Sequence, residues 1–137
     1  MPYFGTSSLK KLSECHPDLQ RLMNEVIKYY DFSITCGYRG EVEQNECYKN
    51  KTSKLKYPDS KHNKQPSLAV DIAPYIPQRE DDKNAWKDER YFHILAGYVL
   101  CMANTLNIPI RWGGDWNSNN YLEDQDWNDL PHFELKI

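Results

Sequence analysis

Four polar side chains in this sequence have the types and spacing that metal chemistry needs: His62, Asp71, Asp129 and His132. Two imidazoles and one carboxylate fill three positions of a tetrahedral zinc ion and leave the fourth position for water. A second carboxylate, three residues before the last histidine, is a candidate for taking a proton from that water. The set predicts a zinc hydrolase with Zn²⁺ as its cofactor.

An expected strand over residues 68–75 sets the direction of the Asp71 side chain. Its large aliphatic residues alternate with Ala69, Asp71 and Ala73, so the two groups point to opposite faces of the strand. The carboxylate therefore shares its face with small neighbours, which leaves room for an ion and for its other ligands.

The remaining patterns predict an α+β fold with a small, mainly antiparallel sheet and flanking helices. Ser7 and Ser8 are expected to cap a short first helix that runs towards Cys15, and Pro17 begins a second. Further helices are expected over 41–50 and 85–104, and further strands over 32–36, 108–112 and 133–136. The elements do not alternate as regular βαβ units, and the whole chain, residues 1–137, is predicted to be one domain.

Composition narrows the class of protein. The formal net charge of −3 over 137 residues argues against a dedicated nucleic-acid binder. No apolar run reaches membrane-spanning length, and the first residues lack the features of a signal peptide. We therefore expect a soluble monomer with no nucleic-acid partner and no membrane insertion. A locally basic stretch fits either a solvated loop or a rim that attracts an anionic substrate; its lysines are Lys49, Lys51, Lys54, Lys56, Lys61 and Lys64.

The four cysteines form no C-x-x-C pair, which argues against a cysteine zinc site. Cys36 and Cys101 fall within apolar stretches and are expected to be small buried residues. A disulfide between Cys15 and Cys47 stays open, although the pattern favours a reducing compartment.

Several further polar and aromatic residues have two interpretations each. His16 is expected at a helix start and His93 in a structural role inside the long helix. Glu134 lies two residues after His132 and faces the same side of a strand, so it either orients a ligand histidine or is a solvated charge. Most of the nearby aromatic residues are expected in the core, with a substrate groove as the alternative; they are Trp112, Trp116, Tyr121 and Trp127.

The motif order resembles that of the zinc peptidases that cut bacterial cell-wall peptides. These are the D-Ala-D-Ala carboxypeptidases and dipeptidases and the phage L-alanyl-D-glutamate endopeptidases. The matching phrases are S-K-H at 60–62, A-V-D at 69–71, D-L-P-H at 129–132 and G-Y-R at 37–39. G-D-W-N at 114–117 and H-F-E-L at 132–135 look most like the phage endolysin branch. The likeness covers nearly the whole chain.

The resemblance implies a function and a role for each site residue. The fold would be Hedgehog/DD-peptidase-like, and the chain a single catalytic domain without a wall-binding domain. It would be an endolysin that hydrolyses the L-Ala–D-Glu bond of the peptidoglycan stem peptide. His62, Asp71 and His132 would bind zinc, and Asp129 would be the general base. Arg39 would stabilise the oxyanion, with a loop salt bridge as its alternative.

Two points remain open within this resemblance. Ser60 would either bind the substrate backbone or order the loop that carries His62. Eight residues separate His62 from Asp71, two more than in the pattern S-x-H-x-x-G-x-A-x-D, and Ser67 stands where glycine is usual. We expect residues 63–66 to bulge outward, because the entropy of loop closure grows slowly with length.

The endolysin resemblance also implies a place of action. The protein would be made in the host cytoplasm, be released through a holin pore and act on the wall during host lysis, as an antimicrobial hydrolase. Three other functions are left: a D-Ala-D-Ala carboxypeptidase or dipeptidase, a wall-binding relative without catalysis, and a structural component of a phage particle.

Overall fold

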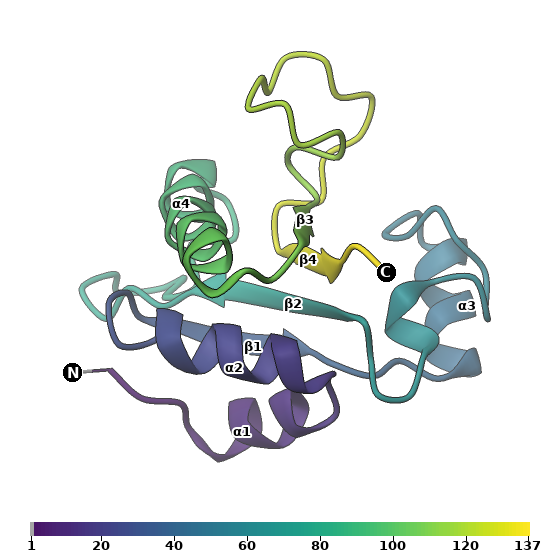
Figure 1. Ribbon diagram of the computed structural model, residues 1–137, viewed down its shortest axis with the longest axis horizontal. Helices are drawn as coiled ribbons and strands as arrows, with labels where there is room; N and C mark the ends of the chain where they lie inside the picture. Colours follow the sequence, from purple (N-terminus) through teal and green to yellow (C-terminus); the bar gives the residue numbers. More distant parts are fainter. Residues whose placement is uncertain (1) are drawn as a thin grey trace.

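The computed structural model describes residues 2–137, in which helices surround one small sheet (Figure 1). The helices are α1 (Thr6–Ser13), α2 (Pro17–Val26), α3 (Glu41–Lys49) and α4 (Glu89–Leu106), with a 3₁₀ helix η1 (Lys61–Asn63). The strands are β1 (Phe32–Cys36), β2 (Ala69–Pro74), β3 (Ile110–Trp112) and β4 (His132–Leu135). The expected α+β class is confirmed.

All strand pairs are antiparallel, in the order β1-β2-β4-β3. Asp71 on β2 is the partner of His132 on β4, and Ala69 is the partner of Glu134. Residues that face each other across an antiparallel pair project to the same side of the sheet. The register therefore brings Asp71, His132 and Glu134 to one face, as the alternation of residue types predicts.

The opposite face of the sheet packs against helices. Val70 and Phe133 are register partners and both are buried in the main hydrophobic core. Helices α1, α2 and α4 supply apolar side chains to the same core; they include Leu12, Leu19, Leu22, Met23, Leu95, Ala96 and Val99. None of the helices in residues 2–137 is both long and apolar enough to cross a membrane.

Two helix starts differ from the sequence predictions. Helix α1 begins after Gly5, and the hydroxyl of Ser8 accepts a hydrogen bond from the backbone of Ile34 instead of capping the helix. Helix α4 begins at Glu89 rather than at residue 85, because Ala85 has a left-handed backbone (φ 52°) and Asp88 provides the cap.

The cysteines also differ in part from expectation. All four are free, so Cys15 and Cys47 form no disulfide. Cys15 is buried, whereas Cys101 is exposed on the outer side of α4 and the expectation that it is buried is wrong. Val99 and Ala103 lie one helical turn apart on the buried face of α4. Cys101 lies two residues from each of them, so the helical period turns its side chain away from that face.

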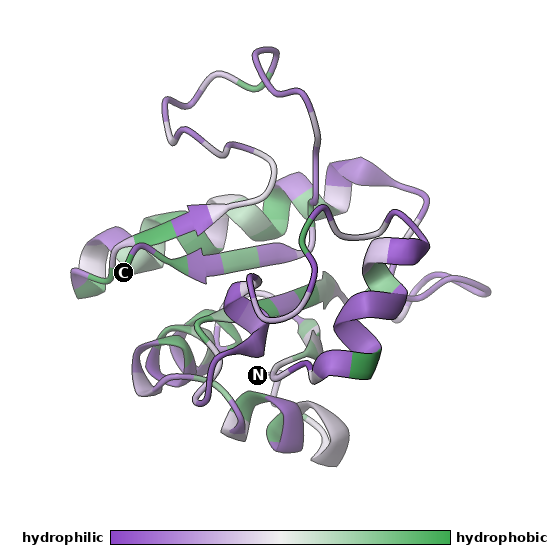
Figure 2. Cartoon of the chain, turned by 90° about the vertical axis from the view of Figure 1, so that its right-hand side faces the viewer, coloured by the Kyte–Doolittle hydropathy of each residue, from purple (hydrophilic) through white to green (hydrophobic). Residues whose placement is uncertain are grey.

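The longest loop without regular structure joins β3 to β4 and projects away from the sheet (Figure 1). Its residues are largely hydrophilic, as Figure 2 shows. At its base, Gly113 donates a hydrogen bond to the carbonyl of His132 and accepts one from the backbone of Asp129, each at 2.8 Å. This pair of bonds fixes the backbone of the segment from Asp129 to His132.

The close contact at Gly113 gives a prediction about stability. A Cβ at this position would lie 2.9 Å from the carbonyl carbon of Asp129 and closer still to its oxygen. Gly113→Ala should therefore lower the free energy of unfolding by about 1–3 kcal/mol, as overpacking commonly does. Gly97→Ala, inside α4 with nothing within 4 Å, should raise it by up to about 1 kcal/mol. Urea denaturation measures both, and equal effects of the two substitutions would contradict this account.

Candidate metal centre

Three side chains from different parts of the chain bring one donor atom each to a common point. His62 Nε2 lies 3.1 Å from Asp71 Oδ1 and 3.3 Å from His132 Nδ1, and His132 Nδ1 lies 3.2 Å from Asp71 Oδ1. Zn–N distances of about 2.0–2.1 Å in a tetrahedral site separate neighbouring donors by about 3.3 Å. The three atoms are therefore spaced as the ligands of one such ion are.

Each imidazole is oriented by its other nitrogen. His62 Nδ1 donates to the carbonyl oxygen of Gly37 at 2.8 Å, and His132 Nε2 donates to Glu134 Oε1 at 2.8 Å. In the neutral imidazoles that a metal ion requires, these bonds leave the lone pairs of His62 Nε2 and His132 Nδ1 facing Asp71. A hydrogen-bond acceptor behind a histidine is the usual arrangement in metal sites. Of the two interpretations of Glu134, this contact favours the one in which it orients a histidine.

Glu134 is itself held between two cations that the sequence reasoning did not single out for this role. Its Oε2 lies 2.6 Å from Arg111 Nη2 and 3.2 Å from Lys61 Nζ. Burial alone raises the pKa of Glu134, but its contacts with His132 and Arg111 outweigh burial and lower that pKa to about 2. The carboxylate therefore stays ionised near neutral pH.

Arg39 lies beside the second oxygen of Asp71. Its Nη2 is 3.2 Å from Asp71 Oδ2, and its Nη1 donates to Gln44 Oε1 at 3.0 Å. Gln44 on α3 is fully buried. Its neighbours in the sequence are polar, so nothing in the sequence predicts that Gln44 contacts the site. The guanidinium both pairs with Asp71, which lies on strand β2, and lines the cavity.

Ser60 orders the segment that carries His62. Its hydroxyl accepts a hydrogen bond from the backbone of His62 at 3.2 Å, and its backbone donates to Asn63 Oδ1 at 3.0 Å. The backbone of Arg39 also donates to the carbonyl of His62 at 2.8 Å. Ser60 is 5 % exposed and lies at the wall of the cavity, where it serves as the N-cap of η1.

The lengthened segment between His62 and Asp71 bulges outward at residues 64–66, which are exposed, while Asn63 is buried. Ser67 then returns to the interior, where its hydroxyl donates to the carbonyl of Ala69 at 2.6 Å. Because the extra length lies in exposed residues, the two side chains still meet at 3.1 Å.

Asp129 lies next to His132 but is not one of the three side chains whose donor atoms converge. Its Oδ2 is 4.0 Å from His132 Nδ1, and its side chain is 26 % exposed. Burial raises the pKa of this carboxyl, the negative charge of Asp71 raises it further, and the result is a pKa of about 6. A carboxyl with this pKa can accept and return a proton near neutral pH.

The protonation of the two histidines reflects the shared carboxylate. Burial alone lowers the pKa of His62, but the charge of Asp71 outweighs burial and raises it to about 10. The pKa of His132 is also raised, because hydrogen bonds to Asp71 and Glu134 outweigh its burial. Burial opposes the ionisation of Asp71, yet His62 and His132 hold its pKa far below the usual range.

Donor atoms in residues 2–137 come close together in two further combinations. Asp71 and His132 lie near Asp129, and His62 and Asp71 lie near Cys36. The Cys36 sulfur is 3.9 Å from His62 Nδ1, the nitrogen that faces Gly37 and not the cluster. This thiol therefore contacts the imidazole at the nitrogen that faces Gly37, and not at the nitrogen that meets His132 Nδ1.

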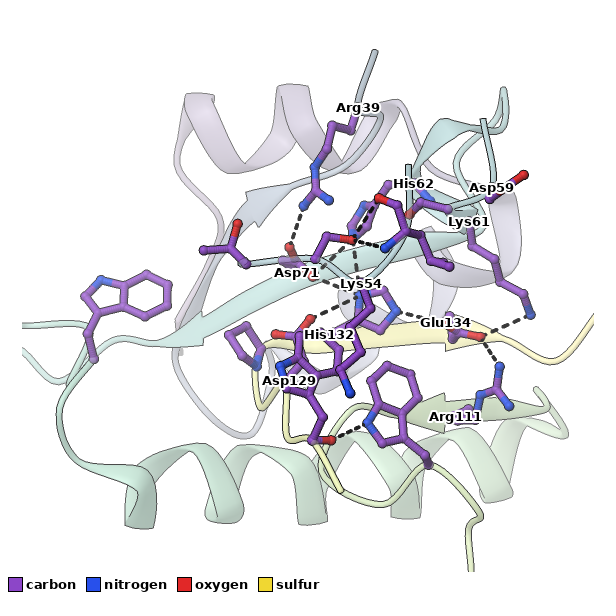
Figure 3. A pocket seen from close by; sticks show the side chains of 18 residues that line it. Arg39, Lys54, Asp59, Lys61, His62, Asp71, Arg111, Asp129, His132 and Glu134 are labelled. Atoms are coloured by element: carbon purple, nitrogen blue, oxygen red, sulfur yellow. Dashed lines mark hydrogen bonds and ion pairs between the residues drawn. The ribbon is translucent and has the colours of Figure 1, made fainter. Parts of the chain in front are cut away.

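The cluster lines an open cavity of about 600 Å³ (Figure 3). Trp116 and Trp127, from the long loop, form part of its wall, and Trp86 lines it as well. Trp112 is buried and Tyr121 is 55 % exposed, so the expectation that most of the four aromatic residues are core is wrong. The polar loop has no core of its own that would bury them. Of the six lysines in the basic stretch, Lys54 and Lys61 line the cavity.

Comparison with known proteins identifies the family. The family model of the phage L-alanyl-D-glutamate peptidases matches residues 2–136, so the chain belongs to this family. An L-alanyl-D-glutamate peptidase of Escherichia phage T5 is 32% identical over 124 residues, which are 89% of this chain and 87% of that protein. The crystal structure of the Serratia marcescens L-Ala D-Glu endopeptidase ChiX superposes with a TM-score of 0.74 at 27% identity, covering 98% of this chain and 90% of that one. The resemblance and the enzyme class expected from the sequence, a peptidase, are confirmed.

The raised pKa of His62 predicts how the metal-free protein responds to pH. An unfolded histidine has a pKa of about 6.5, so the stability that the folded state gains from protonated His62 is complete below about pH 6.5 and is lost as pH rises towards 10. With a chelator present, the urea midpoint of the wild type should fall over this range. His62→Gln should show a shallower fall, and identical slopes for the two proteins would contradict the assignment.

Proposed function

We propose that this protein is a zinc-dependent endopeptidase that hydrolyses the L-Ala–D-Glu bond of the peptidoglycan stem peptide. The observation that carries the proposal is the triangle of donor atoms 3.1–3.3 Å apart, with Asp129 beside it in an open cavity. The bond is inferred from the family and from the printed activities of the phage T5 and Serratia marcescens relatives.

His62 Nε2, Asp71 Oδ1 and His132 Nδ1 would hold the metal ion. Zinc suits this donor set, because nitrogen and carboxylate ligands with one position left for substrate or water are typical of catalytic zinc sites. When bound, zinc supplies Lewis acidity that polarises the scissile carbonyl and makes water acidic enough to lose a proton near neutral pH.

Asp129 is the proposed general base. At neutral pH its carboxylate is largely ionised, since its pKa is about 6. It can take a proton from the attacking water and later pass this proton to the nitrogen of the departing D-glutamyl residue. Gly113 fixes the backbone next to Asp129, so the carboxylate keeps its place while it holds the proton.

Arg39 and Ser60 are proposed to support the reaction from the cavity wall. The Arg39 guanidinium lines the cavity, where a cation stabilises negative charge that develops on the carbonyl oxygen. Its ion pair with Asp71 keeps it in one orientation. Ser60 holds the 3₁₀ turn of His62, and any contact of Ser60 with substrate would come from the same wall.

We further infer that the catalytic unit is one domain that acts on the bacterial wall as a monomer during phage lysis. The family match over residues 2–136 supports a single unit. Release from the host cytoplasm through a holin, and an antimicrobial effect, follow from the endolysin class and belong to this proposal.

Digestion of purified peptidoglycan tests the cleaved bond. Mass spectrometry should find new peptides that begin with D-Glu and glycan-linked fragments that end in L-Ala. Addition of a chelator should abolish them, and added zinc should restore them. Released D-Ala would indicate a carboxypeptidase instead. Wall binding without any product or bound zinc would indicate a non-catalytic relative.

Substitutions separate the base from the ligands. Asp129→Asn should leave zinc bound and lower kcat by about 10²–10⁴-fold, the range for loss of a general base. His132→Ala should lose the metal, as atomic emission would show. Asp126→Asn, on the same loop but exposed and away from the cavity wall, should change neither quantity. Wild-type turnover in Asp129→Asn, or full zinc content in His132→Ala, would remove that residue from its assigned role.

A further inference from the structure

The substrate of the proposed reaction places a negative charge near the scissile bond. A D-glutamyl residue has two carboxyl groups, and the peptide continues through one of them. The other carboxyl group remains a free anion unless it has been converted to an amide. Because the scissile nitrogen belongs to this same residue, a site that cuts the bond must also accommodate its charge.

Four cations line the cavity, and three of them already have carboxylate partners. Arg39 pairs with Asp71 at 3.2 Å, while Lys61 and Arg111 share Glu134 at 3.2 and 2.6 Å. Lys54 is the exception: within residues 2–137 its ammonium forms no ion pair and no hydrogen bond, although Asp59 of the same loop also lines the cavity. Its ammonium is therefore the one among these four cations with no carboxylate that competes with an incoming anion.

Trp127 defines the position of Lys54. The Lys54 Nζ lies 5.3 Å from the centre of the Trp127 ring, a cation–π distance that holds an ammonium without neutralising it. Trp127 stacks on Trp116 with ring centres 5.9 Å apart, and Trp116 lies 5.6 Å from the His132 ring. The row of rings thus leads from the metal centre to the free cation along one wall of the cavity. Figure 3 labels Lys54 among the residues that line this cavity.

We infer that Lys54, held by Trp127, is a specificity-determining residue that binds the free carboxylate of the D-glutamyl residue. This inference rests on the proposed function and adds to it a preference in substrate class. Stem peptides with a free carboxylate on this residue are better substrates than peptides in which the same group is a carboxamide. Direct contact with the amide form lacks the ionic part of the interaction.

Two synthetic stem peptides that differ in this one group test the inference. With zinc-loaded wild type, kcat/KM should be about two- to fivefold higher for the carboxylate peptide, the effect of one exposed ion pair. Lys54→Gln should remove most of this preference by slowing the carboxylate peptide alone, and Lys54→Arg should keep it. Lys54 is exposed, so the variants should retain the wild-type thermal midpoint.

Lys56→Gln provides a matched control. Lys56 belongs to the same loop, is exposed, and has its ammonium 5.0 Å from the centre of the Tyr48 ring, but it does not line the cavity. This variant removes an equal charge and should keep the wild-type preference. If Lys56→Gln lowers the preference as much as Lys54→Gln does, the effect comes from general charge and the inference is overturned.

The remaining outcomes distinguish a failure of the inference about Lys54 from a failure of the proposed function. If the wild type cuts both peptides at L-Ala–D-Glu and Lys54→Gln keeps their ratio, the proposed function stands and the inference about Lys54 fails. An equal loss on both peptides in Lys54→Gln would mean that Lys54 only fixes Trp127, and would also overturn the inference. If the wild type cuts neither peptide at this bond while wall digestion yields D-Ala, both fail.

Discussion

The carboxylate of Asp71 is the constraint on which the rest of the site depends. A buried carboxylate is costly unless partners satisfy it, and here a histidine on η1, a histidine on β4 and the Arg39 guanidinium converge on its two oxygens. These partners come from distant parts of the sequence. They meet because β2 lies in the middle of the sheet and because Asp71 is the register partner of His132. The sheet, held by its helical core, thus brings together groups that would be unstable apart.

The charged groups around this centre are held in place by ion pairs with one another. Lys61 and Arg111 share the single carboxylate of Glu134, which also holds His132, and Asp71 pairs with Arg39 while it faces both histidines. Each pair fixes an orientation as well as a charge, because the partners are partly or fully buried. A site arranged in this way needs little rearrangement when charge develops during a reaction. Among the cavity cations within residues 2–137, it leaves Lys54, beside Trp127, as the one without a carboxylate partner.

The sequence alone was enough to predict the parts of the site that follow from local periodicity. Alternation along β2 placed Asp71 away from the core, and the i, i+2 relation placed Glu134 beside His132. Gln44 and Arg111 could not be found in this way, since their roles depend on contacts between segments far apart in the chain. Most of the aromatic residues near the site are expected in the core, with a substrate groove as the alternative, yet Trp116 and Trp127 line the cavity. Their loop is largely hydrophilic and does not bury them.

The longer segment between His62 and Asp71 shows how loops can vary around a fixed centre. Its ends are anchored by different means: Ser60 and Asn63 form a capping box at η1, and the backbone of Ser67 bonds to Glu14 and His16. Extra residues between these anchors cost little, because they add length to an exposed turn and no strain to the ligands. The donors lie on a strand, a 3₁₀ turn and a strand, whereas the cavity walls come largely from loops 50–60 and 113–131. Changes in those walls can therefore alter which peptide is bound while the distances among the metal-binding atoms stay the same.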